Sequence, residues 1–220
     1  MIPVVIATEP ASFEKTVRQP GLAAIDEMVG LVPPLKRRGR RRQQIANNKS
    51  DIPADKFPPF WRNCIDDMMQ AYKMRCAYLA MHIEYTGNPT VDHIIPKSLE
   101  WSKVYEWSNY RLCAGVVNSK KGDLMGVVDP IDAGTGWFEL NLASCRVVRG
   151  TNAPIAQHAK IDATLPILNL RDCCKQREQY VADYLLGPGA KGIDITYLER
   201  RAPFIASELR RQKRLARGDK

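Results

Sequence analysis

The sequence predicts an α+β protein that is mostly helical and carries a small strand–strand–helix unit between two helical segments. Apolar residues recur at spacings of three and four over residues 60–87, and helical patterns return from about residue 152 onward. Between these segments, residues 90–95 (TVDHII) and 108–114 (SNYRLCA) have the composition of short strands. Residues 115–125 (GVVNSKKGDLM) then predict a short helix.

Before this unit, the chain predicts one helix and a linker. Residues 12–30 have helical composition, interrupted at Gln19-Pro20-Gly21. Residues 31–59 are proline-flanked, basic and without apolar periodicity. We therefore expect a mobile or extended linker there, part of which orders only on a partner.

After the unit, the pattern predicts a hairpin and then helices. Residues 137–142 and 146–150 predict the hairpin, and residues 165–186 and 195–217 predict helices separated by a break at 187–192 (GPGAKG). The chain therefore divides into an N-terminal helical and basic extension (1–57), a core (58–150) and a C-terminal helical region (151–220).

Composition places the chain among ordinary globular proteins. It has 220 residues, of which 45% are hydrophobic and 26% charged, enough for one domain or a core with an added lobe. No apolar run approaches the roughly 20 residues that a membrane span needs. The first residues have neither the basic head nor the cleavage pattern of a secretory signal. We therefore expect a cytoplasmic protein.

The charge of the chain favours a polyanionic partner. The formal net charge is +9, and residues 36–42 (KRRGRRR) place six cations in seven positions. Residues 198–220 carry a second basic cluster. A solvated basic face or a flexible tail is the alternative for each cluster. Two clusters in one chain favour contact with nucleic acid, because phosphates attract lysine and arginine by counterion release.

Residues 90–123 contain the side chains that phosphodiester hydrolysis needs. The reaction requires a group that activates water, ligands for a divalent cation, and a positive charge near the phosphate. His93 suits the first task because imidazole titrates near neutral pH. Asp92 and Asn118 offer the oxygen ligands that Mg²⁺ or Mn²⁺ prefers, and Lys121 suits the third task.

Spacing is compatible with a single site. Neighbours in a strand point to opposite faces, so Asp92 and His93 can serve different tasks at a strand end. Asn118 and Lys121 are three apart and share a helix face. If the strands and the helix fold back on one another, Asn118 meets Asp92 across the metal. Asn109 would then hydrogen-bond the loop that carries His93 and fix the imidazole.

The segments VDHIIPKS, SNYRL and VNSKKG together resemble the HNH endonuclease motif, the ββα-metal finger. They are especially similar to the HNH domain of CRISPR RNA-guided nucleases, which also runs V-D-H-I-x-P-x-S and ends on an N-x-x-K helix. The resemblance implies that Asp92 and Asn118 bind the metal and that His93 is the general base. It also implies that Asn109 braces the loop and that Lys121 lies beside the scissile phosphate.

A wider pattern, W..C.DD…AY…CAY…IE…VDH..PKS…YEW.NYRL…N..K, resembles a bacterial group that includes the HNH component of Septu-type and retron-linked anti-phage systems. This resemblance implies a nuclease effector in anti-phage defence, with DNA favoured over RNA. It also implies an ABC- or SMC-like ATPase as partner. The N-terminal 57 residues and the C-terminal helix are the candidate docking surfaces.

The sequence departs from that group at its zinc ligands. Many members hold a structural Zn²⁺ with two C-x-x-C pairs, whereas here the positions read Cys76-Ala-Tyr-Leu79 and Cys113-Ala-Gly-Val116. Two thiolates do not make a closed tetrahedral site. We therefore expect no structural Zn²⁺, with Leu79 and Val116 packed where the ion would have bound. The six cysteines of the chain are expected to be reduced.

Three basic residues flank the site: Lys97, Arg111 and Lys120. We expect them to contact phosphates, and a plain surface role is the alternative for each. The competing hypothesis for the whole protein is a basic adaptor whose finger grips nucleic acid or an acidic partner without cutting.

Overall fold

The structure is a computed structural model, and it describes residues 1–187 and 192–219. The helices are α1 (Gln19–Met28), α2 (Ile65–Ala71), α3 (Gly115–Lys121), α4 (His158–Leu168), α5 (Arg171–Leu185), α6 (Ile195–Arg201) and α7 (Pro203–Arg211). The strands are β1 (Pro89–His93), β2 (Tyr110–Ala114), β3 (Phe138–Asn141) and β4 (Arg146–Arg149). None of the helices in the described residues is long and apolar enough to cross a bilayer.

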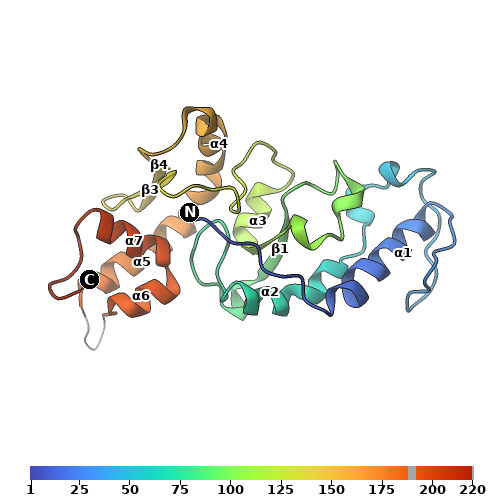
Figure 1. The fold of residues 1–220 in the computed structure, drawn as a ribbon, viewed down its shortest axis with the longest axis horizontal. Coiled ribbons are helices and arrows are strands. Elements are labelled where there is room, and N and C mark those ends of the chain that lie inside the picture. Colours follow the sequence, from blue (N-terminus) through green and yellow to red (C-terminus); the bar gives the residue numbers. More distant parts are fainter. Residues whose placement is uncertain (188–191, 220) are drawn as a thin grey trace.

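The molecule is a mixed α+β fold, as predicted, with 44% helix and two small antiparallel sheets in the described part of the chain. It is elongated: α1 lies at one end, β1 and α3 in the middle and α4–α7 at the other end (Figure 1). One buried cluster includes apolar residues from all three parts of the sequence, for example Val17, Leu112 and Phe204.

The predicted interruption of the first helix at Pro20 is absent. A π-helical turn, Glu14–Arg18, leads directly into α1, and Pro20 falls in the first turn of that helix. A proline is tolerated there because the first N–H groups of a helix have no intrahelical partner. Gly21 follows because a Cβ at this position would collide with the ring of Tyr105.

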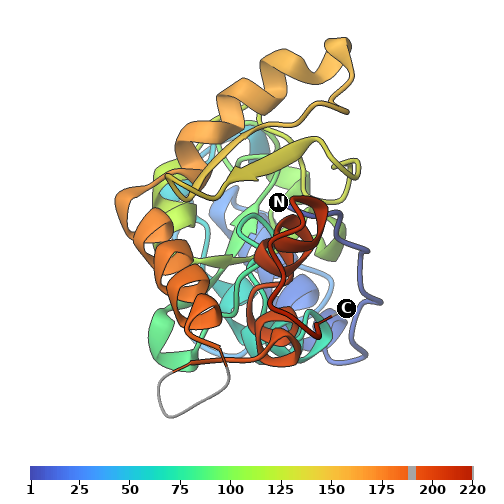
Figure 2. The ribbon, with the colours of Figure 1, turned by 90° about the vertical axis from the view of Figure 1, so that its left-hand side faces the viewer.

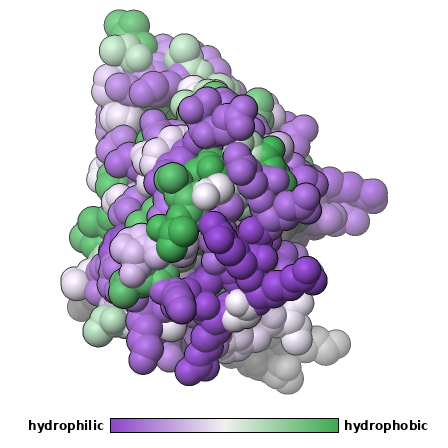
Figure 3. All heavy atoms as spheres, turned by 90° about the vertical axis from the view of Figure 1, so that its right-hand side faces the viewer, coloured by the Kyte–Doolittle hydropathy of each residue, from purple (hydrophilic) through white to green (hydrophobic). Residues whose placement is uncertain are grey.

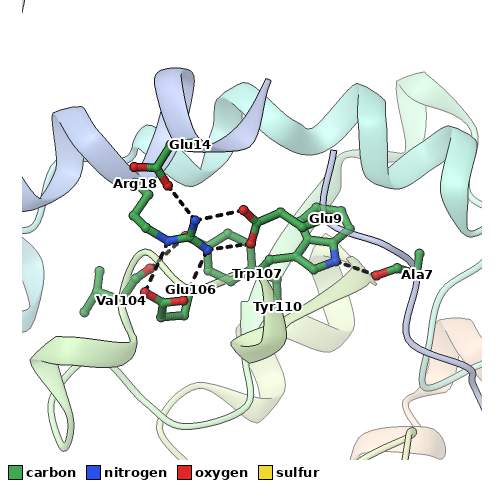
Figure 4. A network of polar contacts seen from close by, with 8 residues as sticks. All are labelled: Ala7, Glu9, Glu14, Arg18, Val104, Glu106, Trp107 and Tyr110. Atoms are coloured by element: carbon green, nitrogen blue, oxygen red, sulfur yellow. Dashed lines mark hydrogen bonds and ion pairs between the residues drawn. The ribbon is translucent and has the colours of Figure 1, made fainter. Parts of the chain in front are cut away.

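The N-terminal segment is anchored on the loop between β1 and β2. Arg18 forms ion pairs with Glu9 at 2.5 Å, with Glu14 at 2.6 Å and with Glu106 at 3.3 Å, and Trp107 Nε1 donates to the carbonyl of Ala7 at 2.7 Å (Figure 4). Residues from the extension therefore brace the loop that connects the two strands.

Residues 31–48 have no helix or strand and are mostly exposed, as expected for an extended linker, but the segment 31–59 is anchored on the rest of the protein at several points. Glu27 is 6% exposed, and its carboxylate binds the Arg37 guanidinium at 2.5 Å and accepts from the backbone N–H of Arg42 at 2.9 Å. Further along, Ile52 and Phe57 are buried in the core. These contacts could not be predicted from the basic, proline-rich composition of the segment, because they depend on partners outside it.

The predicted helix over residues 60–87 is mostly wrong. A 3₁₀ turn (Phe60–Cys64) leads into α2, which ends at Ala71. Lys73 and Met74 then adopt positive φ angles of 53° and 55°, which no helix can continue through. The chain turns back so that the N–H of Ala77 donates to the carbonyl of Leu112 in β2 at 2.9 Å.

The central unit has the predicted order of strand, strand and helix. β1 pairs with β2 in antiparallel register, with His93 opposite Tyr110. α3 ends at Lys121, earlier than predicted, because Gly122 turns the chain with φ 48° and ψ −130°. Glycine adopts this conformation without strain.

The predictions for the C-terminal region are confirmed in kind but not in every boundary. The helix predicted over 165–186 is two helices, because the chain leaves helical geometry at Asn169 and Leu170, and α4 begins already at His158. β3 and β4 form the expected hairpin, with Phe138 opposite Arg149. Figure 2 shows α5 beside α6 and α7, with the hairpin and α4 above them. The predicted helix over 195–217 is divided, because Ala202 leaves helical geometry before Pro203 starts α7. The predicted break at 187–192 falls largely on residues 188–191, which lie outside the described residues.

Candidate active site

The strand register separates the predicted acid and base residues onto opposite faces of the hairpin. Asp92 lies opposite Arg111, and His93 lies opposite Tyr110. Side chains of paired residues share a face, and neighbours along a strand alternate. Asp92 therefore points toward one side of the β1–β2 hairpin, and the His93 ring points toward the other.

Asp92 is held by two partners inside the protein. Its side chain is 2% exposed, its Oδ1 lies 3.0 Å from Lys121 Nζ, and its Oδ2 accepts from the Tyr78 hydroxyl at 2.7 Å. Burial raises the pKa of Asp92, while Lys121 and Tyr78 act in the opposite direction. Tyr78 was not predicted as a site residue, because it was assigned to the interior of a long helix.

The two predicted residues of α3 both lie on the Asp92 side of β1. Asn118 Nδ2 donates to Thr90 Oγ1 and to the Val91 carbonyl, each at 3.1 Å. Lys121, one turn later, reaches Asp92 and also donates to the His93 carbonyl at 3.0 Å. The helix therefore runs alongside the strand in the same direction, so that Asn118 sits near residue 90 and Lys121 near residue 92.

This arrangement differs in one respect from the predicted one. The direct contact of Asp92 with α3 is made by Lys121, whereas the Asn118 amide contacts the preceding two residues of β1. Lys121 is 1% exposed as a residue, so its ammonium is directed inward to a carboxylate.

His93 lies in an aromatic and almost closed environment. The residue is 8% exposed, and its ring packs edge-on against Trp61 and Tyr110, with centroids 4.9 Å and 5.0 Å away. Its Nε2 lies 3.0 Å from the carbonyl of Val104. A carbonyl only accepts, so Nε2 carries a hydrogen and the neutral ring keeps a lone pair on Nδ1.

Burial lowers the pKa of His93 to about 3, against the opposing effect of the bond to Val104, with Lys97 and Lys121 lowering it further. The ring is therefore neutral at physiological pH. A neutral imidazole accepts a proton, but a pKa this low makes it a weak base until a negative charge approaches.

Asn109 makes the contacts that the sequence predicts for a loop brace. Its Oδ1 accepts from the N–H of Ile95 at 2.8 Å. Its Nδ2 donates to the carbonyls of Ile95 at 3.1 Å and Lys103 at 3.0 Å. The side chain thereby joins the residues just after His93 to the segment that carries Val104.

The three flanking cations have different surroundings. Lys97 lies with its Nζ 4.6 Å from the centre of the Trp61 ring, close to the His93 side of the site. Arg111 is 5% exposed and forms a two-point ion pair with Asp129, at 2.7 Å and 2.5 Å. Lys120 is exposed on α3. Lys97 and Lys120 are thus placed where a phosphate can approach, whereas the charge of Arg111 is already compensated.

The oxygen atoms around Asp92 are of the type that a hard divalent cation prefers as ligands. The Asp92 carboxylate, the Asn118 amide oxygen and the Val91 carbonyl are the donors that Mg²⁺ or Mn²⁺ prefers. Two rearrangements would be needed, because Lys121 already compensates Asp92 and the Asn118 nitrogen faces β1. Among the described residues, no three or more His, Cys, Asp and Glu side chains gather as a metal site.

The residues of the degenerate zinc pattern do lie together. Burial raises the pKa of Cys76, but bonds from the Cys113 thiol and from the N–H groups of Ala114, Leu79 and Tyr78 outweigh it and lower the pKa to about 7. Leu79 and Val116 line one cavity of about 340 Å³ with Cys76. Leu79 is 5% exposed and Val116 is 46% exposed, so only the leucine is buried.

In comparisons with known proteins, no family model, no curated protein and no solved structure matches the chain.

Proposed function

We propose that this protein is a metal-dependent nuclease of the HNH type that hydrolyses phosphodiester bonds in nucleic acid, with DNA favoured over RNA. The main support is the placement of Asp92, Asn118 and Lys121 on one face of a hairpin-and-helix unit, with Asn109 bracing the loop after His93. These residue types are the ones that phosphodiester hydrolysis needs.

Each side chain has a role in this proposal. Asp92 and Asn118 would hold Mg²⁺ or Mn²⁺, which supplies positive charge to the phosphate oxygens when bound. Lys121 would leave Asp92 and turn toward the phosphate. The neutral Nδ1 of His93 would take a proton from water. The approaching phosphate raises the pKa of His93 by its negative charge, which makes the ring a better base.

A second candidate function is a nucleic-acid-binding adaptor without catalysis. One observation favours it: the Asp92 oxygens and His93 Nε2 are all engaged within the protein, and both residues are nearly buried. A site that never rearranges would keep these internal contacts and would not cut.

Cleavage assays separate the two functions. Supercoiled plasmid and RNA are incubated with the protein in Mg²⁺, Mn²⁺ or EDTA. The nuclease nicks in the presence of metal and loses this activity in His93→Ala. His158→Ala is the matched control, because its Nε2 also contacts a carbonyl, that of Ala153 at 3.1 Å, outside the strand–strand–helix unit. Equal cleavage by both variants would refute the role of His93.

The proposal extends to a defence context, in which an ABC- or SMC-like ATPase controls the nuclease. The assay is therefore repeated in the presence of an ABC- or SMC-like ATPase, where one is encoded beside the gene for this protein. Retention of nucleic acid in EDTA, with no nicking in any metal with or without the ATPase, would favour the adaptor.

A further inference from the structure

A groove with a cationic lining lies at the α1 end of the molecule. It has a volume of about 650 Å³ and runs between the first helical segment, the 3₁₀ turn Phe60–Cys64 and the basic loop, by which we mean residues 36–42. Among the described residues, four basic and no acidic side chains line it. The lining residues that matter here are Lys15, Lys36, Arg38, Gln19, Phe60 and Asn63.

The basic loop is held in shape by a buried carboxylate. Glu27 binds Arg37 at 2.5 Å and the N–H of Arg42 at 2.9 Å, at the two ends of the loop. Arg37 also donates to the Arg40 carbonyl at 2.6 Å. Arg37 thus has a structural role, and the other cations of the loop have exposed side chains.

Both basic clusters of the sequence contain paired and unpaired cations. In the C-terminal cluster, Arg201 pairs with Glu84, Arg210 with Glu199 and Arg211 with Glu208. In the part of the chain that the structure describes, Lys36, Arg38 and Arg40 form no ion pair with a carboxylate, and neither does Lys15 across the groove. Arg200, Lys213, Arg214 and Arg217 of the C-terminal cluster likewise have no ion pair within the described residues, so uncompensated charge lies at both ends of the molecule, and at the α1 end it lines a groove together with the basic loop.

Figure 3 shows this end of the molecule, where hydrophilic side chains surround a smaller apolar patch. Exposed apolar residues of the segment just before the basic loop are Leu31, Val32 and Leu35. Because hydrophilic surface dominates and the groove is lined by basic side chains, the end suits a polyanion in water better than an apolar partner.

The groove adjoins the candidate active site through consecutive residues. Phe60 lines the groove, and the next residue, Trp61, packs against the His93 ring at 4.9 Å. Lys97 Nζ lies 4.6 Å from the centre of the Trp61 ring. One cation therefore lies on Trp61, and others line the groove at the preceding residue, Phe60.

We propose that this groove binds the sugar–phosphate backbone of the nucleic acid and directs the strand past Trp61 to His93. The basic loop, clamped by Glu27, provides the phosphate contacts. The proposal deepens the proposed function and rests on it for the direction of the strand, whereas binding itself does not require cleavage.

Binding is measured by fluorescence anisotropy in EDTA, with labelled DNA and RNA as single strands and duplexes. The test variant is K36Q/R38Q/R40Q. The matched control is K213Q/R214Q/R217Q, which removes the same charge from exposed positions at the other end of the molecule. We expect the test variant to lose about tenfold or more in affinity at low salt, and its salt slope to fall by about 2 to 3. The control should retain most of its affinity.

Glu27→Gln tests whether the shape of the loop matters beyond its charge. This variant raises the net charge by one, so bulk attraction alone predicts tighter binding, whereas loss of the clamp predicts weaker binding. We expect Glu27→Gln to bind more weakly than the wild type. The triple variant K36Q/R38Q/R40Q should keep the thermal midpoint of the wild type, because its substituted side chains are exposed.

The outcomes separate the two proposals. Equal losses of affinity in the test and control variants, or tighter binding by Glu27→Gln, would overturn the proposal that the groove binds nucleic acid. Preference for anionic vesicles or polyglutamate over nucleic acid would also overturn it. Groove-dependent binding by a protein that never nicks in any metal would support the groove and refute the nuclease.

Discussion

The Lys121 ammonium lies 3.0 Å from the Asp92 carboxylate, and the two side chains are 0% and 2% exposed. This pair joins the last turn of α3 to the end of β1, at the centre of the strand–strand–helix unit. A buried pair of this kind stabilises less than its attraction suggests, because both charges lose their hydration. Removal of one partner is costly, since it strands the other charge.

Lys121→Met should therefore destabilise the fold by about 3 to 5 kcal/mol, measured as the free energy of unfolding in urea. Lys120→Met, on the exposed face of the same helix, is the control and should change it by less than about 0.5 kcal/mol. In the Lys121→Met background, Asp92→Asn should cost less than it does in the wild type, because it removes the stranded charge. Equal costs in the two backgrounds would show that the residues are not coupled.

Asn109→Ala should loosen the loop that follows His93. The side chain makes three hydrogen bonds to backbone atoms of Ile95 and Lys103, so its loss leaves buried groups without partners. We expect a loss of about 2 to 4 kcal/mol in the free energy of unfolding, together with faster amide exchange at Ile95. Asn47→Ala, at an exposed position, should change neither. Unchanged protection at Ile95 would contradict the role of Asn109 as a brace.

Acid should destabilise the protein through His93. The unfolded imidazole has a pKa near 6.5, and burial lowers the folded value to about 3. Between these values the unfolded chain binds a proton that the folded protein does not, so the free energy of unfolding falls as pH decreases from about 6.5 toward 3. The additional slope approaches 1.4 kcal/mol per pH unit.

The measurement is a set of urea unfolding curves between pH 7 and pH 4, compared with His93→Gln. Glutamine does not titrate and keeps an N–H for the Val104 carbonyl, so the variant should show a shallower decline. His158→Gln should retain the slope of the wild type. If His93→Gln followed the wild-type curve, the imidazole would be charged or exposed in the folded protein.

The sequence predicts local features of the site well and its long-range contacts poorly. The strands, α3 and the position of Asn109 follow from composition and spacing within about 30 residues. Tyr78 and Trp61 were missed, because the apolar periodicity of residues 60–87 also fits one long helix. Lys73 and Met74 break that helix by adopting left-handed conformations without a glycine to signal them. The sequence likewise supplies Lys121 but does not decide whether its charge meets a phosphate or Asp92.

The degenerate zinc pattern offers a test of how closely the turn at 76–79 approaches α3. Leu79 and Val116 each stand three residues after a free cysteine, Cys76 or Cys113, and they line one cavity with Cys76, whose thiol is hydrogen-bonded to that of Cys113. The double variant L79C/V116C should therefore complete a site of four thiolates and bind about one Zn²⁺ per chain. Elemental analysis of the purified protein measures this, and added Zn²⁺ should raise the thermal midpoint.

L185C/L186C is the control, because it adds two thiols at exposed positions that do not lie beside Cys76 and Cys113. The low pKa of Cys76 favours the outcome, since the thiolate is the form that binds metal. No more zinc in L79C/V116C than in the control would mean that the two segments do not meet at a tetrahedral centre.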